Sequence, residues 1–401
     1  MKKLTKVLCL LLAMLMIFSA CGTAPEDNDK KKRKDDKPEP TAQVSDFEKD
    51  KAEYDAMTAE ELVEKYVKDP SAITVEEYAA LIATYAFVPD NGEGEFESDN
   101  KTKQAVDMVR EAGSDLPSAL NEELCSIMLA QPYPYARAYY YRLLINATAA
   151  EGSAVYEALL AQYQNETDPF VIACMVMGTA RSLGVNPDYC AYVLALADSD
   201  YVPTRRFLAT QLGSLDGADR DTLVEKAIAL CGDEDLTVRN RALEMCGRIG
   251  DDRLVEPLSA VLKDMDMLSS HSAAAKGLLY MWYSPNNISE AAYNATMEYF
   301  RTESTEPKHP SWSAINVLTV KPGDMNKWRE QATFFDAEEL VAIMTTLVAD
   351  ADAEKLIKTN AVKVIALHGT ADDLNALKPL VENSADKDAI LKEIEKALEG
   401  K

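Results

Sequence analysis

The stretch of sequence that decides the fold is residues 235–258, DLTVRNRALEMCGRIGDDRLVEPL. Asp235 can accept hydrogen bonds from the first free amides of a helix, and Gly250 suits the left-handed conformation in which helices often end. Apolar residues then follow at helical spacing, at Leu254, Leu258, Val261 and Leu262. The stretch therefore predicts two consecutive helices, the second with an apolar face that a neighbouring helix must cover.

Charged residues around the first of these helices are expected to be structural. Asp235 and Arg239 are four residues apart, so the spacing predicts an ion pair along the helix. Aspartates also cluster in the turns, for example at Asp233 and Asp235. The glycine and the twelfth-position glutamate of a calcium loop are missing there, so we expect helix caps and no metal site.

The pattern recurs along the chain. Steps of 34 residues from Arg239 reach Arg205, Val171 and Arg137 in one direction and Ala273 in the other. A further copy covers residues 358–380, and a degraded unit is expected around residues 311–318. Apolar residues keep helical spacing from residue 47 onward while strand-like alternation is scarce, which predicts an all-α protein.

The central unit has an Asp-x-x-Val-Arg-x-x-Ala core followed by Gly-x-Ile-Gly-Asp and Pro-Leu. It resembles a HEAT repeat, in particular the variety named after phycobilisome lyases. The resemblance implies an α-solenoid of stacked HEAT-like helical hairpins, with the motif helix of each pair lining a concave face. It also implies interaction rather than catalysis. Val171 and Ala273 replace the repeated arginine, so a continuous arginine ladder between repeats is not expected.

The first residues of the chain predict export. Lys2, Lys3 and Lys6 precede the apolar run Val7–Phe18, which has the length of a signal-peptide core. The tetrapeptide Phe18–Cys21 that closes this region resembles a bacterial lipobox. The resemblance implies that Cys21 is lipidated and becomes the new N-terminus. We therefore expect a lipid-anchored protein of the bacterial cell envelope, on the outer face of the cytoplasmic membrane or on an outer membrane if the cell has one.

Four segments are expected along the chain. They are a lipoprotein signal peptide (1–20), a disordered tether (21–46), an N-terminal helical cap (47–104) and the HEAT-like α-solenoid (105–401). The tether is polar and rich in charge, with too little apolar surface to offset the entropy of ordering. Within the cap, residues 91–100 predict an exposed acidic loop.

Composition restricts the partners. The formal net charge of −25 over 401 residues disfavours binding to phosphate backbones, so no nucleic-acid role is expected. A protein or peptide partner fits better, and the acidic balance favours a basic one. The cysteines and the three histidines show no ligand spacing, so neither a metal nor a cofactor is predicted. No catalytic motif is present either, and the chain is not expected to be an enzyme.

Two aromatic clusters are the candidate ligand-binding residues. The first comprises Tyr135, Arg137, Tyr139, Tyr140 and Tyr141, and the second contains Trp282 and Tyr283. Three consecutive tyrosines sweep about 200° of a helix, so at least one should be exposed. Tyrosines also commonly fill seams between helices, and this alternative stays open. The expected function is a scaffold or adaptor that binds a protein or peptide. The alternatives are a carbohydrate- or cell-wall-binding lipoprotein and, with less support, a lyase-like enzyme or enzyme subunit.

Overall fold

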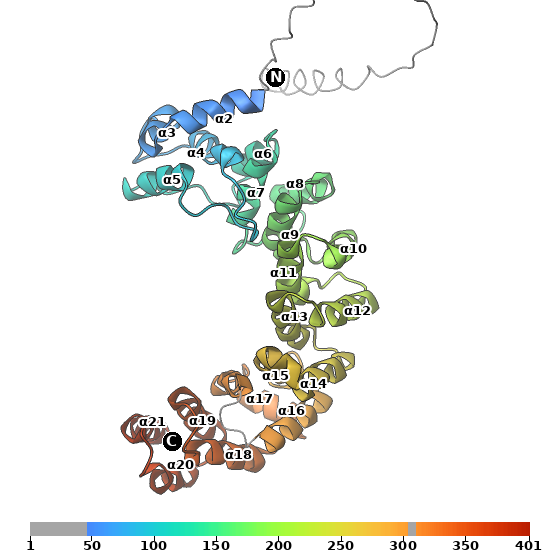
Figure 1. Ribbon diagram of the computed structural model, residues 1–401, viewed down its shortest axis with the longest axis vertical. Helices are drawn as coiled ribbons and strands as arrows, with labels where there is room; N and C mark the ends of the chain where they lie inside the picture. Colours follow the sequence, from blue (N-terminus) through green and yellow to red (C-terminus); the bar gives the residue numbers. More distant parts are fainter. Residues whose placement is uncertain (1–45, 304–309) are drawn as a thin grey trace, which may run out of the picture. The chain divides into compact units, whose positions relative to one another are not determined.

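The computed structural model describes residues 46–303 and 310–401 (Figure 1). The expected signal peptide, the lipidation site Cys21 and the tether up to residue 45 lie outside the described residues. All of the repeated helices lie in one compact unit, which begins at Asp50.

The described part of the chain is helical, as expected from the periodicity. Within these ranges, the only β pairing is a single bridge between Asp90 and Phe96. None of the described helices is both long and apolar enough to span a membrane.

Capping boxes start two of the first helices. The hydroxyl oxygens of Thr58 and Thr74 accept from the amides of Glu61 and Glu77, and each glutamate accepts from the threonine amide in return. The first helices are α2 (Asp46–Ala56), α3 (Ala59–Tyr66), α4 (Val75–Ala83), η1 (Thr84–Phe87), α5 (Lys101–Glu111) and α6 (Glu122–Leu129). Helix α5 packs on α3 and contains residue 104, the predicted end of the cap. The boundary that we expected between cap and repeats therefore falls inside a helix.

Five helices carry the repeated sequence positions, and we call them the motif helices. They are α7 (Pro134–Leu143), α9 (Pro169–Leu183), α11 (Val202–Gln211), α13 (Leu236–Ile249) and α15 (His271–Trp282). All five residues of the 34-residue register, from Arg137 to Ala273, lie in the first turn of their helix. Each motif helix contacts the next in chain order (Figure 1).

A second set of helices alternates with the motif helices. It consists of α8 (Ala154–Gln162), α10 (Pro187–Ala195), α12 (Arg220–Cys231), α14 (Val255–Lys263) and α16 (Glu290–Glu303). Helices α12 and α14 pack on α13 and α15, respectively. The apolar face predicted here is buried: Leu254, the residue before α14, and Leu258 of α14 are both 0% exposed. Burying a leucine in this way contributes about 1.5–3 kcal/mol.

Local chemistry explains where the central motif helix begins and ends, and how closely it packs. The Asp235 carboxylate accepts from the amides of Thr237 and Val238, and Gly250 ends α13 in the left-handed region at φ 63°. Gly247 faces Gly277 of α15, and a Cβ at Gly247 would lie 2.5 Å from the Gly277 carbonyl oxygen. Only glycine permits the two helices to approach so closely.

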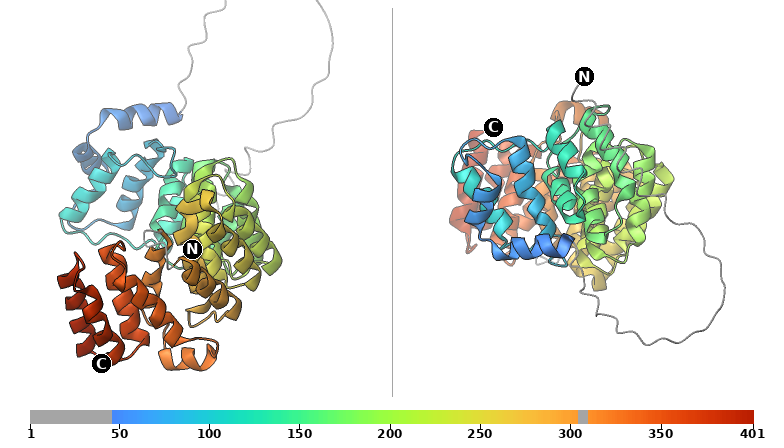
Figure 2. Two further views of the ribbon diagram at one scale, coloured as in Figure 1. Left: turned by 60° about the horizontal axis from the view of Figure 1, so that its bottom comes forward. Right: turned by 90° about the horizontal axis from the view of Figure 1, so that it is seen from above.

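The remaining helices begin with η7 (Pro310–Thr319), which lies in the expected degraded unit and contacts both α15 and α19. The others are α17 (Met325–Gln331), α18 (Ala337–Ala349), α19 (Lys355–His368), α20 (Ala371–Leu377), η8 (Lys378–Val381) and α21 (Lys387–Glu399). Figure 2 shows α18 to α21, coloured orange to red, side by side. Lys358 of α19 occupies the position of Arg239 in the repeat and is buried.

Candidate functional site

Two of the predicted ligand-binding tyrosines lie inside the protein. Tyr140 and Tyr141 are 0% and 1% exposed. Their hydroxyls donate to the Ala119 carbonyl and to the Glu166 carboxylate, both at 2.9 Å. The prediction that they contact a ligand is therefore wrong, because α7 is covered by α4, α6 and α9. Burial raises the pKa of Tyr141 well above its usual value, and Glu166 adds to the effect.

Tyr135 and Tyr139 are partly exposed, but other rings of the protein cover them. Tyr139 stacks on Tyr85 with 3.6 Å between ring centroids. Phe96 contacts Tyr135 and Tyr139 at edge-to-face angles, and Phe170 completes the cluster. At least one of the three consecutive tyrosines was expected to be exposed, and Tyr139 is the one that retains some accessible surface.

Arg137 forms a buried ion pair and is not free for a ligand. Its guanidinium donates to both carboxylate oxygens of Glu166, at 2.8 and 2.7 Å, and to the Gln131 carbonyl at 2.6 Å. Burial by itself would raise the pKa of Glu166. Hydrogen bonds from Arg137, Gln162 and Tyr141 outweigh burial and lower this pKa. Glu166 precedes α9, so the pair joins one hairpin to the next.

The second predicted cluster is also part of the core. Trp282 and Tyr283 are 0% and 4% exposed, so the prediction that they bind a ligand on the surface is wrong. The indole of Trp282 donates to the Thr296 hydroxyl at 3.1 Å, and the Tyr283 hydroxyl lies 3.0 Å from Nε2 of His368. They are buried because rings from three helices pack around them: Tyr293 of α16, Trp328 of α17 and His368 of α19.

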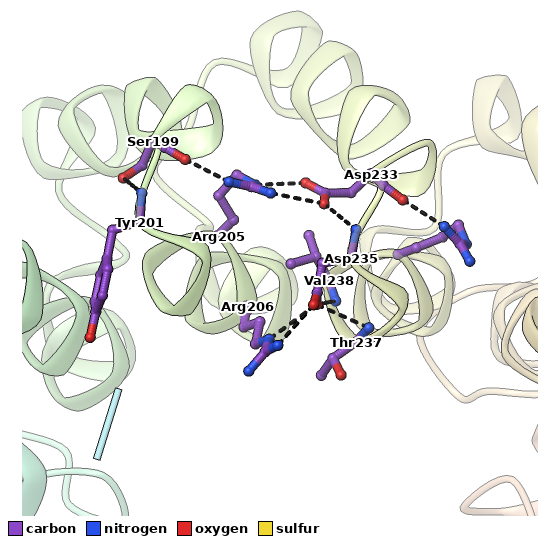
Figure 3. Close-up of polar contacts among 9 residues, drawn as sticks. Ser199, Tyr201, Arg205, Arg206, Asp233, Asp235, Thr237 and Val238 are labelled. Carbon is purple, nitrogen blue, oxygen red and sulfur yellow. Dashed lines mark hydrogen bonds and ion pairs between the residues drawn. The ribbon is translucent and has the colours of Figure 1, made fainter. Parts of the chain in front are cut away.

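Arginines of α11 bind the aspartates that precede and cap α13. Figure 3 shows Arg205 pointing toward Asp233 and Arg206 toward Asp235. Arg205 donates to Asp233 at 2.7 and 3.1 Å, and Arg206 donates to Asp235 at 3.0 and 2.8 Å. The hydrogen bonds from Arg206 lower the pKa of Asp235 to about 2.

The predicted ion pair between Asp235 and Arg239 is wrong. Arg239 instead donates to the Ser270 hydroxyl at 2.9 Å and to the Asp233 carbonyl at 2.7 Å. A carboxylate oxygen of Asp235 accepts from the Val238 amide and so caps α13. This position places the carboxylate next to α11, the preceding motif helix. Spacing along one helix could not reveal this partner on another.

The three register arginines share one arrangement. Arg137, Arg205 and Arg239 each donate to the carbonyl six residues earlier and to a side chain that precedes the next motif helix. Val171 and Ala273 are buried apolar residues at the same register position. The arginine ladder is therefore interrupted, as the substitutions at these positions predicted.

The loop predicted at residues 91–100 lies against the motif helices. The stretch 90–97 makes these contacts, and we call it the acidic loop. Arg142 of α7 donates to the Gly94 carbonyl at 3.0 Å and to Glu95 at 3.3 Å. Tyr201 donates to Asp90 at 2.6 Å, and Arg206 of α11 pairs with Glu93. Glu93, Glu95 and Glu97 are exposed as expected, whereas Phe96 is 9% exposed. Most residues of the loop are thus exposed as predicted, but Phe96 is buried because it enters the tyrosine cluster.

Gly94 permits this close approach of the loop to α11. Its φ is +81°, and a Cβ at this position would lie 2.7 Å from Cβ of Pro203 and 3.0 Å from the Phe207 ring. The loop thus covers the side of α11 that carries Pro203, Arg206 and Phe207.

The equivalent side of α13 and α15 is not covered by the loop. We call it the open face, and its partly exposed or exposed residues are Asn240, Arg241, Glu244, Arg248, Lys276 and Tyr280. Asn240 and Arg241 are one 34-residue step from Arg206 and Phe207. Lys276 of α15 reaches Glu244 of α13 at 3.2 Å, which shows that the two helices present these side chains to the same side.

The motif helices have a charge opposite to that of the whole chain. They carry nine basic residues, Arg137, Arg142, Arg181, Arg205, Arg206, Arg239, Arg241, Arg248 and Lys276. Their one acidic residue is Glu244. The sequence contained this signal, but a net charge of −25 averaged over the chain conceals it.

The described cysteines and the groups that could hold a metal ion were candidates for reactive chemistry. The five described cysteines are free and buried, and burial raises the pKa of Cys174 to about 12 and of Cys190 to about 11. These thiols therefore hold little thiolate near neutral pH. Across residues 46–303 and 310–401, no group of three or more His, Cys, Asp or Glu side chains is placed to hold a metal ion.

Comparisons with known proteins give no further identification. No protein-family model matches the chain, and no curated protein gives a significant match to it.

Proposed function

We propose that this chain is an exported, lipid-anchored α-solenoid of HEAT-like hairpins that binds a protein or peptide on a concave face lined by its motif helices. The observation that carries the binding role is the open face, which places three basic residues and Tyr280 on adjacent motif helices. Arginine and tyrosine are favoured at binding hot spots.

The solenoid architecture is supported by the order of the contacts. Each motif helix from α7 to α15 contacts the next one in the chain, and the register arginines reach forward into the following unit. Repeats of this kind bury their apolar sides on their neighbours and leave one side of each helix accessible along the array. That accessible side is the proposed binding surface.

The anchor rests on the sequence of the first twenty-one residues. Exchange of Cys21 for Ser should release the protein from the membrane fraction and abolish lipid labelling, because the thiol is the proposed acylation site. A Cys9→Ser variant is the matched control, since Cys9 lies within the segment that would be cleaved. A Cys21→Ser protein that stays in the membrane fraction and still incorporates lipid contradicts the anchor.

The binding role can be tested by affinity capture after crosslinking in cells that carry the tagged full chain. An Arg248→Ala, Tyr280→Ala variant should lose its protein partners. The control variant Ile228→Ala, at a 39% exposed position on α12, should keep them. Retention on purified cell wall, with no protein captured by the wild type, would favour the carbohydrate-binding alternative and contradict this proposal.

A further inference from the structure

The acidic loop shows how the motif helices bind carboxylates. The guanidinium of Arg142 donates to a backbone carbonyl and to a carboxylate of the loop. Tyr201 and Arg206 bind two more of its carboxylates. Glu93 and Glu95 stay 65% and 59% exposed, so each ion pair is weak individually. Burial of Phe96 and the close contact at Gly94 fix the loop in place.

The open face continues the surface that the loop covers. Arg241 lies one register step beyond Phe207. Arg248 packs against Gly213, two residues after α11, where a Cβ would lie 2.8 Å from that of Arg248. Arg241 and Lys276 share the single carboxylate of Glu244, at 3.5 and 3.2 Å. Arg248 is exposed. The open face therefore has more positive than negative charge.

We propose that the open face binds an acidic segment of the partner protein, in continuation of the path of the acidic loop. This inference rests on the proposed binding function and names the chemistry of its partner. Charge complementarity determines whether the partner segment is acidic or basic. The whole chain is acidic and would favour a basic partner. However, charges farther than about 8 Å away are screened at physiological salt. On the open face itself, Arg241, Arg248 and Lys276 outnumber the one carboxylate of Glu244 and favour an acidic segment.

A direct test measures peptide binding to the full chain purified in detergent. The probe is a fluorescein-labelled synthetic peptide with the sequence of residues 90–99, DNGEGEFESD. Because the loop is tethered to the chain, it competes for its own binding place at an effective concentration in the millimolar range. The added peptide therefore binds at the open face. We expect saturable binding by fluorescence anisotropy, and we expect the affinity to fall as salt is raised.

Two charge-reversal variants locate the site. The double exchange Arg241→Glu, Arg248→Glu should weaken binding at least tenfold. The matched control Lys392→Glu, Lys396→Glu makes the same charge change at α21 and should alter the affinity less than twofold. A charge-conserving Arg241→Lys, Arg248→Lys variant should keep most of the affinity and guards against loss through misfolding.

Several results would overturn the inference. These are no binding of the acidic peptide at millimolar concentration, equal weakening by the α21 control, or tighter binding of an oligolysine peptide or an oligothymidylate. If cells still yield a partner whose capture depends on Tyr280 but the acidic peptide fails to bind, only the acidic chemistry is wrong. If no protein partner depends on the open face, the proposed function fails as well.

Discussion

The central and C-terminal parts of the molecule join their helices by different chemistry. In the central part, ion pairs connect neighbouring hairpins on either side of Val171, namely the Arg137–Glu166 and Arg205–Asp233 pairs. Between α15 and α19, a ring cluster takes over. It consists of Trp282, Tyr283, Trp328, Phe335 and His368. The ring cluster begins at the end of α15, the motif helix whose register position is held by Ala273.

The difference shows that residues at the same repeat position can join neighbouring helices through different contacts. The register places equivalent residues at the start of each motif helix in both parts. The arginine at that position matters only where the next unit supplies an acceptor. In the C-terminal part, Lys358 occupies the equivalent position, and its Nζ donates to the Ser384 hydroxyl at 3.4 Å. Stability there should depend on the rings, and substitutions in each part can test this contrast.

Trp328→Ala should have the largest effect. Trp328 is 1% exposed and its indole donates to the Trp282 carbonyl at 3.0 Å, so its loss leaves a cavity and an unpaired carbonyl. We expect a loss of about 3–5 kcal/mol in the free energy of unfolding. Hydrogen exchange should accelerate in α15, α17 and α19 and stay unchanged in α7 and α9.

Leu356→Ala is the matched control for this variant. Leu356 is on α19 and is 63% exposed, so its removal should change stability by less than about 0.5 kcal/mol. Faster exchange in α7 and α9 after Trp328→Ala would show that the two parts unfold as one cooperative unit.

Glu166→Ala tests the central part. It leaves the guanidinium of Arg137, which is 13% exposed, without its carboxylate. Removing one partner of a buried ion pair costs about 3 kcal/mol or more. Urea unfolding should report this loss, and exchange should accelerate in α7 and α9.

Glu157→Ala, at an exposed position on α8, should have almost no effect on the same measurements. A Glu166→Ala protein within about 1 kcal/mol of the wild type would contradict a stabilising role for the ion pair.

His368 should make the C-terminal part sensitive to mild acid. Burial lowers the pKa of His368 to about 4, with Arg329 and Lys401 adding to the effect. Between about pH 6.5 and 4 the unfolded chain therefore binds a proton that the folded chain does not. Stability should fall with decreasing pH in this window by about 1.4 kcal/mol per unit. Melting of a His368→Gln variant should show a shallower slope, and an unchanged slope would refute this assignment.

Asp235 should give the smallest effect, at lower pH. Its pKa of about 2 lies below the ordinary 3.8, so its contribution is complete above about pH 4 and is lost as pH falls toward 2. Asn can still cap α13, so Asp235→Asn should cost about 0.5–1.5 kcal/mol at neutral pH. Its melting temperature should depend less on pH between about 4 and 2. The exposed neighbour variant Glu234→Gln serves as the control, and an effect of equal size there would contradict a specific pair with Arg206.

Much of the local structure could be predicted from sequence. The cap at Asp235, the left-handed Gly250 and the buried leucines of α14 depend on short-range patterns, and the structure confirms them. The 34-residue register also reached the first turn of each motif helix correctly. These features depend on residues within one hairpin.

The site could not be predicted as well, because it depends on what packs over each helix. The tyrosines of α7 were predicted to bind a ligand. However, α4, α6 and α9 cover α7, and the loop adds Phe96. Arg206 was likewise invisible as the partner of Asp235, since the two are 29 residues apart on different helices. Burial that other segments impose leaves no signature in a helix's own periodicity.

The central functional claim is that the open face contacts a protein partner. The most direct test places a photo-crosslinking amino acid at position 280 of the full chain in cells, with position 228 on α12 as the comparison. We predict a discrete protein adduct from position 280 that is missing from position 228. Adducts of equal yield from both positions, or none from position 280, would contradict the account.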